Sequence, residues 1–143
     1  MKLVDVNLLI YATNTAAERH RPARSWLEET LSGSETVALP WSVLLAFVRI
    51  TTNARIMDPP LRADAAMNYV DAWLAQTSVT TPEPTNRHPK LVRELLGATG
   101  TGGNLVTDAH LAALAIEHGA TLCSCDSDFA RFPGLNWTNP LAP

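Results

Sequence analysis

The N-terminal residues read Lys2-Leu3-Val4-Asp5-Val6-Asn7-Leu8-Leu9-Ile10-Tyr11-Ala12, and this stretch sets the architecture of the chain. Residues 2–6 are nearly all apolar, which predicts a central strand that is covered on both faces. Residues 7–12 predict a short helix packed on the same sheet. Asp5 therefore lies in apolar surroundings with no Lys or Arg as a sequence neighbour. A carboxylate in such surroundings costs several kcal/mol unless something pairs with it.

Strand and helix signals alternate along the rest of the chain. Strands are predicted over residues 36–39, 78–81, 121–125 and 136–138, and helices over residues 16–32, 41–52, 61–76, 88–97 and 104–118, with a helical turn over 127–132. Gly97 is predicted to end one helix and Asn104 to cap the next, across a flexible loop at residues 99–103. This alternation predicts an α/β three-layer sandwich with a mainly parallel central sheet, formed by a single domain over residues 1–143.

The composition indicates a globular protein without a membrane segment. Of the 143 residues, 46% are hydrophobic and 17% are charged, and no apolar run approaches the ~20 residues of a membrane span. The N-terminus enters a strand directly, without a signal segment, so we expect a cytoplasmic protein. The net charge of −3 argues against an ordinary basic nucleic-acid binder, although nine of the eleven cations are arginines, which suit phosphate. The basic residues at 19–24 form either a rim for a polyanion or ion pairs with Glu28 and Glu29.

Three further acids follow elements that the predicted topology brings to the same edge of the sheet as Asp5. Asp126 and Asp128 come after the strand 121–125, and Asp108 begins the apolar face of the helix 104–118. Because sites in parallel sheets form beyond the carboxyl ends of the strands, we expect these carboxylates to converge. Taken alone, Asp108 could serve the helix dipole, and the Asp126 and Asp128 pair could be a turn. Acids on three separate segments favour a divalent cation site instead.

The ligand types indicate which metal and which chemistry to expect. Oxygen ligands without a His or Cys set select Mg²⁺ or Mn²⁺ over zinc, and such ions activate water and stabilise charge on a phosphoryl group. No Walker A loop, dinucleotide motif or Ser-His-Asp order is present. The two cysteines, Cys123 and Cys125, are a weak metal signal even with His110 and His118 nearby, and we expect buried free thiols.

Several segments resemble the PIN-domain ribonucleases. Residues 3–12 resemble the first strand and helix of these proteins, and residues 108–115, Gly119 and residues 125–129 resemble their closing half. The segments 41–55 and 132–135 look like the VapC toxins of bacterial type II toxin–antitoxin pairs. The resemblance spans almost the whole chain, in length and in order.

The resemblance implies a Mg²⁺-dependent endoribonuclease, with Mn²⁺ as the other suitable ion, that cleaves RNA phosphodiester bonds with a metal-activated water. It implies a homodimer and a VapB-type antitoxin whose tail occupies the active-site groove. Residues 8–11 and the helix that begins at Trp41 either supply dimer or antitoxin surface or pack in the core, and core packing is favoured for most of them.

The resemblance also implies roles for individual residues. Asp5, Asp108 and Asp126 match the catalytic, metal-binding acids, Asp128 matches a further acid near the metal, and Asn7 matches a polar position that supports the first aspartate. We expect Arg49 and Arg131 at the rim, where each either holds the RNA backbone or forms a structural ion pair.

One position departs from the family pattern. Many PIN domains carry a glutamate on the third helix, near Ala46, but no acid occurs from Thr36 to Met57. The site is then weaker, relies on Asp128, or binds one ion until RNA supplies phosphate oxygens. Two alternatives to the nuclease stay open: a PIN module that binds antitoxin or RNA without cutting, and a small-molecule phosphohydrolase. The latter would normally place a second acid at position 7, where Asn7 stands.

Overall fold

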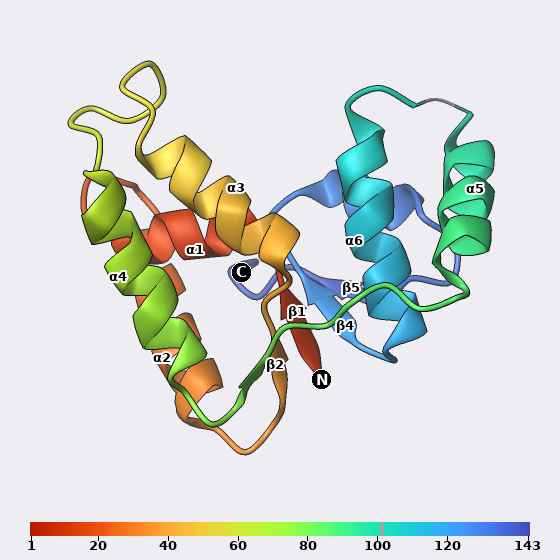
Figure 1. The fold of residues 1–143 in the computed structure, drawn as a ribbon, viewed down its shortest axis with the longest axis horizontal. Coiled ribbons are helices and arrows are strands. Elements are labelled where there is room, and N and C mark those ends of the chain that lie inside the picture. The colour runs from red at the N-terminus through yellow and green to blue at the C-terminus, as the bar shows by residue number, and fades with distance from the viewer. Residues whose placement is uncertain (101) are drawn as a thin grey trace.

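In the part of the chain that the structure describes, five short strands form one parallel sheet at the centre of the molecule (Figure 1). They are β1 (Lys2–Val4), β2 (Val37–Ala38), β3 (Val79–Thr80), β4 (Thr121–Cys123) and β5 (Trp137–Thr138). The computed structural model describes residues 1–100 and 102–143, and every strand pair in that part of the chain is parallel, in the order β3-β2-β1-β4-β5. The prediction of a mainly parallel α/β sandwich is confirmed.

Along residues 1–100 and 102–143, six helices and one 3₁₀ turn connect these strands. They are α1 (Val6–Thr13), α2 (His20–Ser32), α3 (Trp41–Thr51), α4 (Ala63–Leu74), α5 (His88–Thr99), α6 (Leu105–Glu117) and the turn η1 (Ser127–Arg131). The chain steps from β1 to β2 to β3 in one direction and then returns to β4 and β5 on the other side of β1. Because such crossovers are right-handed, the reversal puts α1–α4 on one face of the sheet and α5 and α6 on the other (Figure 1).

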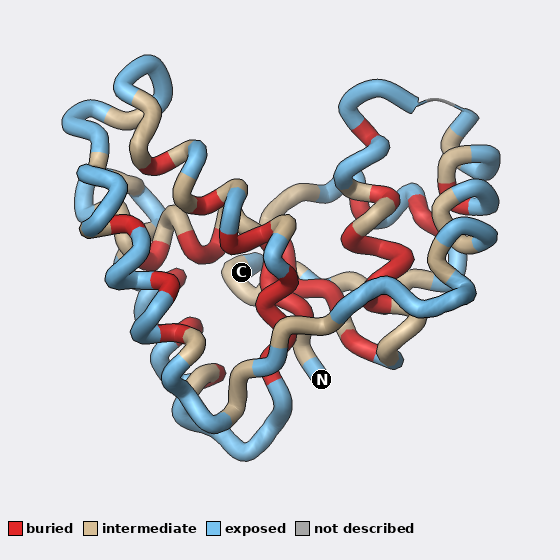
Figure 2. Tube along the Cα trace, viewed as in Figure 1, coloured by how far each residue is buried: buried red, intermediate tan, exposed pale blue. Residues whose placement is uncertain are grey.

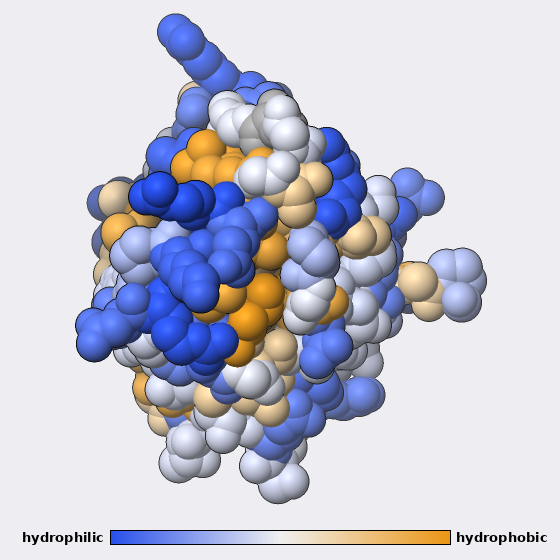
Figure 3. Space-filling model, turned by 90° about the vertical axis from the view of Figure 1, so that its right-hand side faces the viewer, coloured by the Kyte–Doolittle hydropathy of each residue, from blue (hydrophilic) through white to orange (hydrophobic). Residues whose placement is uncertain are grey.

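The core follows the two central strands. Leu3 and Val4 of β1 and Leu122 and Cys123 of β4 are buried, as strands covered on both faces require. Figure 2 shows burial concentrated on the sheet and on the inward sides of the helices, whereas α5 is largely exposed. Seen from the side of α5, the surface is mostly hydrophilic, with apolar side chains visible in the middle of that face (Figure 3). Within residues 1–100 and 102–143, no helix is long and apolar enough to cross a membrane.

Several predicted boundaries differ from the structure. The predicted strand 2–6 ends at Val4, because Asp5 already serves as the N-cap of α1. Likewise β4 ends at Cys123, and α2 begins at His20 instead of residue 16. Propensity places an element well but its ends poorly, since capping contacts decide where a helix begins.

One prediction about the segment before α6 is wrong, and a second holds for the position only. Gly97 does not end α5, which continues to Thr99, and Gly100 is the residue with the left-handed backbone (φ 69°) that favours glycine. Asn104 precedes α6, but its side chain makes no capping hydrogen bond, because its backbone is already helical (φ −62°, ψ −20°) instead of extended. Of the predicted loop 99–103, residue 101 lies outside the described residues.

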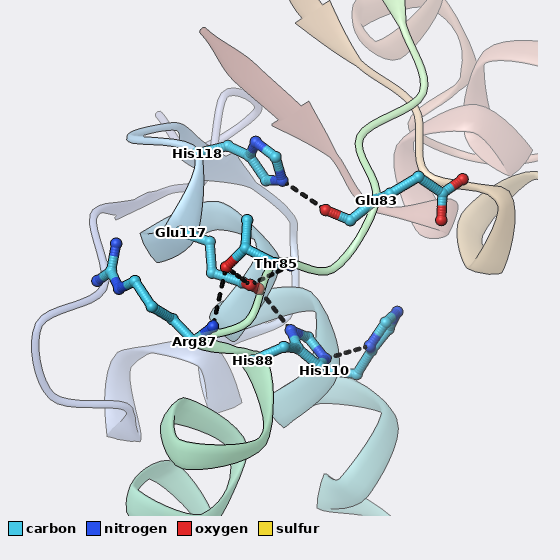
Figure 4. A network of polar contacts seen from close by, with 7 residues as sticks. All are labelled: Glu83, Thr85, Arg87, His88, His110, Glu117 and His118. Carbon is cyan, nitrogen blue, oxygen red and sulfur yellow. Dashed lines mark hydrogen bonds and ion pairs between the residues drawn. The ribbon is translucent and has the colours of Figure 1, made fainter.

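A polar network fastens α5 and the segment before it to the C-terminal end of α6 (Figure 4). The Glu117 carboxylate accepts hydrogen bonds from the Thr85 backbone N–H and hydroxyl, and it contacts His88 Nδ1. His88 Nε2 lies 2.9 Å from His110 Nδ1. His118 Nε2 lies 2.7 Å from the Glu83 carbonyl oxygen. Both histidines that could have completed a zinc site with the cysteines therefore have other partners: His110 contacts α5, and His118 contacts the segment before it.

Candidate metal centre

The predicted acids lie together at the point of the sheet where the order of strand addition reverses, between β1 and β4. Asp5 follows β1 and Asp126 follows β4, and these neighbouring strands form the switch point beyond which sites form in open parallel sheets. A pocket of about 230 Å³ opens there, between α3 from one helical layer and α6 from the other. Its polar and small lining residues are Asp5, Asn7, Ser42, Ala46, Arg49, Thr107, Asp108 and Asp126.

Asp5 is held rigidly by its own neighbours. Its side chain is buried, and Oδ1 accepts a hydrogen bond of 2.8 Å from the Val6 backbone N–H at the start of α1. Oδ2 accepts hydrogen bonds from Ser124 Oγ at 2.8 Å and from Asn7 Nδ2 at 3.3 Å. Burial raises the pKa of Asp5, and the hydrogen bonds from Ser124 and Val6 offset part of that rise. The carboxylate thus has a fixed orientation at the carboxyl end of β1.

Ser124 is one residue of the site that sequence reasoning missed. Its buried hydroxyl donates to Asp5, accepts from Asn7 Nδ2 at 3.0 Å, and accepts from the Asp126 backbone N–H at 3.0 Å. Asn7, which the resemblance placed beside the first aspartate, lies there and also accepts from the Cys125 N–H through Oδ1. The available signal was a hydroxyl residue next to the apolar pair Leu122-Cys123 and two positions before an acid.

Three further carboxylates lie close together near Asp5. One oxygen from each of Asp108, Asp126 and Asp128 lies within 4.8 Å of the others. Asp126 caps η1, because its Oδ1 accepts from the Asp128 backbone N–H at 2.9 Å. Burial, followed by the negative charges of Asp5, Asp126 and Asp128, raises the pKa of Asp108 to about 6. Such repulsion among oxygen ligands is what a divalent cation relieves, so this residue set fits Mg²⁺ or Mn²⁺.

The wall formed by α3 carries no acid. Ser42, Ala46 and Arg49 recur at helical spacing along the pocket, so Ala46 lies where the family pattern has a glutamate. Arg49 therefore lines the same pocket as the carboxylates. Arg131 does not: with Asp128 it lines a separate, more open hollow beside the start of α6.

The other candidate residues from the sequence, the two cysteines and the basic segment 19–24, do not line this pocket. Cys123 and Cys125 are free, but only Cys123 is buried as expected, whereas Cys125 is half-buried beyond the end of β4. Burial raises the pKa of Cys123 to about 11 and also raises the pKa of Cys125. Both thiols are therefore protonated at neutral pH and are poor nucleophiles and ligands. In the basic segment 19–24, Arg24 forms an ion pair of 2.9 Å with Glu28.

Comparisons with known proteins agree over the whole chain. The family model of the PIN domain matches residues 2–135. The sequence is 49% identical over 142 residues to ribonuclease VapC37 of Mycobacterium tuberculosis, which covers 99% of each chain. A crystal structure of VapBC2 from Rickettsia felis, bound to a DNA fragment from their promoter, has a chain that matches with a TM-score of 0.70 at 21% identity, over 96% of this chain and 97% of that one. VapC20 of M. tuberculosis, a sarcin–ricin loop cleaving toxin, matches with a TM-score of 0.67 at 19% identity, over 95% and 99%.

Proposed function

The chain belongs to the PIN domain family, and from that membership we propose that it is a VapC-type endoribonuclease toxin that depends on a divalent cation. The observation that carries the proposal is the convergence of Asp5, Asp108, Asp126 and Asp128 from three separate segments at the switch point of the sheet. A relative that is 49% identical over its full length and named a ribonuclease supports RNA as the substrate. Residues 1–143 would act together as one PIN domain.

The residues of the site would have different roles in phosphodiester hydrolysis. Asp108, Asp126 and Asp128 would hold the cation, Mg²⁺ or Mn²⁺, with Asp5 beside them. When bound, the ion would supply the positive charge that activates water and offsets the charge developing on the phosphate. Ser124 and Asn7 keep the Asp5 carboxylate oriented through the hydrogen bonds that they donate to it.

The two predicted arginines would act at different points along the RNA. Arg49 lines the acidic pocket, where its guanidinium can bind phosphate oxygens, and Arg131 lines the neighbouring hollow, where it would contact the strand further along. Each arginine would thus place one positive charge beside the acidic site, where the backbone of a polyanion could bind.

Cleavage of RNA by purified protein tests the proposal. Asp5→Asn and Asp108→Asn remove charge with little change in volume, so we expect each to lower the cleavage rate at least about a hundredfold, and EDTA to abolish cleavage by the wild type. Asp71→Asn, on the exposed side of α4, is the matched control and should cleave like the wild type. Equal cleavage by all of these proteins would mean that the activity does not come from this pocket.

A second candidate function rests on Ala46. The pocket has no α3 carboxylate, which favours a PIN module that binds RNA or antitoxin and cleaves weakly or not at all. Mn²⁺ binding by titration calorimetry separates the two. Binding that Asp108→Asn abolishes, together with no cleavage of structured or unstructured RNA, would favour the binding module.

We propose a VapB-type antitoxin and a second copy of the chain as protein partners. The VapBC2 assembly from R. felis matches this fold and supports the first. For the second, α3 exposes two large apolar side chains one turn apart, Trp41 (41% exposed) and Leu45 (58% exposed). Leu8 and Leu9, by contrast, are core residues and cannot contribute to either surface.

A further inference from the structure

One buried hydroxyl in the pocket has no partner. Among the described residues, Ser42 Oγ is the buried side-chain polar atom for which no hydrogen bond exists. Native proteins pair nearly all such atoms, because an unpaired buried hydroxyl has lost its water and gained nothing in return. We therefore expect the Ser42 hydroxyl to form its hydrogen bond with a ligand that binds during function.

The surroundings of Ser42 indicate the charge of that ligand. Ser42 is the second residue of α3, and it shares the helix face of Ala46 and Arg49 that lines the pocket. Across the pocket stand Asp5, Asp108 and Asp126. The acidic side suits a cation, whereas the α3 side offers a hydroxyl donor, a guanidinium and the first turn of a helix, all of which favour an anion.

We propose that the Ser42 hydroxyl donates a hydrogen bond to a non-bridging oxygen of the RNA phosphate that lies in the pocket, and that Ser42 is thus a substrate-binding residue. The inference rests on the proposed function, since it needs a phosphodiester between the carboxylates and α3. Ser42 then binds the phosphate from the same face of α3 on which the family pattern would place an acid. The small side chain of Ala46, one turn along, leaves room for the phosphate to approach.

This role has a consequence for the free protein that a structural role does not share. Ser42→Ala removes a buried hydroxyl that has no partner, so the midpoint of thermal unfolding should stay the same or rise. A serine that held α3 in place would lower the midpoint when truncated. The unfolding midpoint therefore separates binding from packing before any RNA is added.

Binding of RNA is the direct test. A short fluorescein-labelled single-stranded RNA of mixed sequence is titrated with Ca²⁺ present, fluorescence anisotropy gives Kd, and a gel checks that the RNA stays intact. We expect Ser42→Ala to raise Kd about three- to tenfold, the usual effect of one lost hydrogen bond. Ser42→Thr, which keeps the hydroxyl, should bind more tightly than Ser42→Ala. Ser34→Ala, on an exposed loop, is the matched control and should match the wild type.

Mn²⁺ titration of the same proteins shows which proposal fails if one does. Ser42→Ala should bind Mn²⁺ like the wild type, because the hydroxyl faces the phosphate and the carboxylates hold the ion. An unchanged Kd for RNA in Ser42→Ala, or a weakened affinity for Mn²⁺, overturns the role of Ser42 while the nuclease proposal stands. A wild type that binds neither Mn²⁺ nor the RNA overturns both.

Discussion

At Asp108 the fold opposes ionisation of a carboxyl group. Burial, then the charges of Asp5, Asp126 and Asp128, raises its pKa from 3.8 to about 6. The folded state therefore binds more protons than the unfolded state between these values, and stability falls as the pH rises through that window. Asp108→Asn should raise the free energy of unfolding of metal-free protein above pH 6 by about 1–2 kcal/mol, a figure reduced because the side chain is partly exposed. The gain should vanish near pH 4.

Urea unfolding at several pH values, with EDTA present, measures this difference. Adding Mn²⁺ should reverse the order of the two proteins at neutral pH, because the ion stabilises only the form that binds it. An Asp108→Asn protein that is less stable than the wild type without metal would show that Asp108 has a structural role.

Ser124 should behave in the opposite way to Ser42, although both are serines of one site. The Ser124 hydroxyl donates to the buried Asp5 carboxylate and accepts from two donors, so Ser124→Ala removes three hydrogen bonds and leaves Asp5 only those from Val6 and Asn7. We expect a loss of about 1.5–3 kcal/mol in the free energy of unfolding, the usual worth of a hydrogen bond to a charged group. Ser127→Ala, exposed in η1, is the control for chemical denaturation. Equal stability of the two variants would exclude Ser124 as the support of Asp5.

At the scale of elements, the sequence predicted what depends on local pattern. The apolar runs of β1 and β4 each lead to an acid, and that pattern placed both strands at the centre and Asp5 and Asp126 at one edge. The end of α5 was not predictable in this way. Gly97 and Gly100 are both plausible stops, and only the backbone shows that Gly100 takes the left-handed conformation. Ser42 and Ser124 were missed because their roles follow from their three-dimensional surroundings. The side-chain partners of the Ser124 hydroxyl lie on a segment distant in sequence, whereas the buried Ser42 Oγ has no partner among the described residues.

The junction of α5 and α6 gives a prediction at this scale. Burial by itself would raise the pKa of Glu117, but hydrogen bonds from Thr85 and His88 outweigh it and lower the pKa below 4.5. A lowered pKa contributes stability that is present above pH 4.5 and lost as the pH falls through the folded value. Glu117→Gln should therefore cost about 1–2 kcal/mol at pH 7 and lose its effect toward pH 3.

Hydrogen exchange shows where that cost appears. Faster exchange in α5 than in α1 would place the loss at the α5–α6 junction, whereas uniform acceleration would contradict a local role for the network. Glu94→Gln removes a surface ion pair with Lys90 (3.9 Å) and should change stability by less than about 0.5 kcal/mol.

At the scale of the whole molecule, the two helical layers have separate contributions to the site. The layer of α1–α4 brings the α3 wall with Ser42 and Arg49, and the layer of α5 and α6 brings Asp108. The pocket exists only where the layers meet, beyond the switch point between β1 and β4. Length, order and apolar pattern could predict this meeting point. They could not predict how an acid-free α3 completes it.

The same helix that forms one wall of the pocket also offers a surface for self-association. Trp41 and Leu45 lie one turn apart, and both stay exposed while Ser42 and Ala46 line the pocket. A two-fold interface through Trp41 and Leu45 would bury the same apolar surface on both copies. Light scattering during size exclusion should therefore give a dimer for the wild type and a monomer, or a much weaker dimer, for Leu45→Arg. Ile56→Arg places the same charge at a side chain that is also exposed (55%) but lies beyond α3, and it should remain dimeric. A monomeric wild type at micromolar concentration would leave Trp41 and Leu45 to another partner, and the antitoxin would then be the first protein to test against Leu45→Arg.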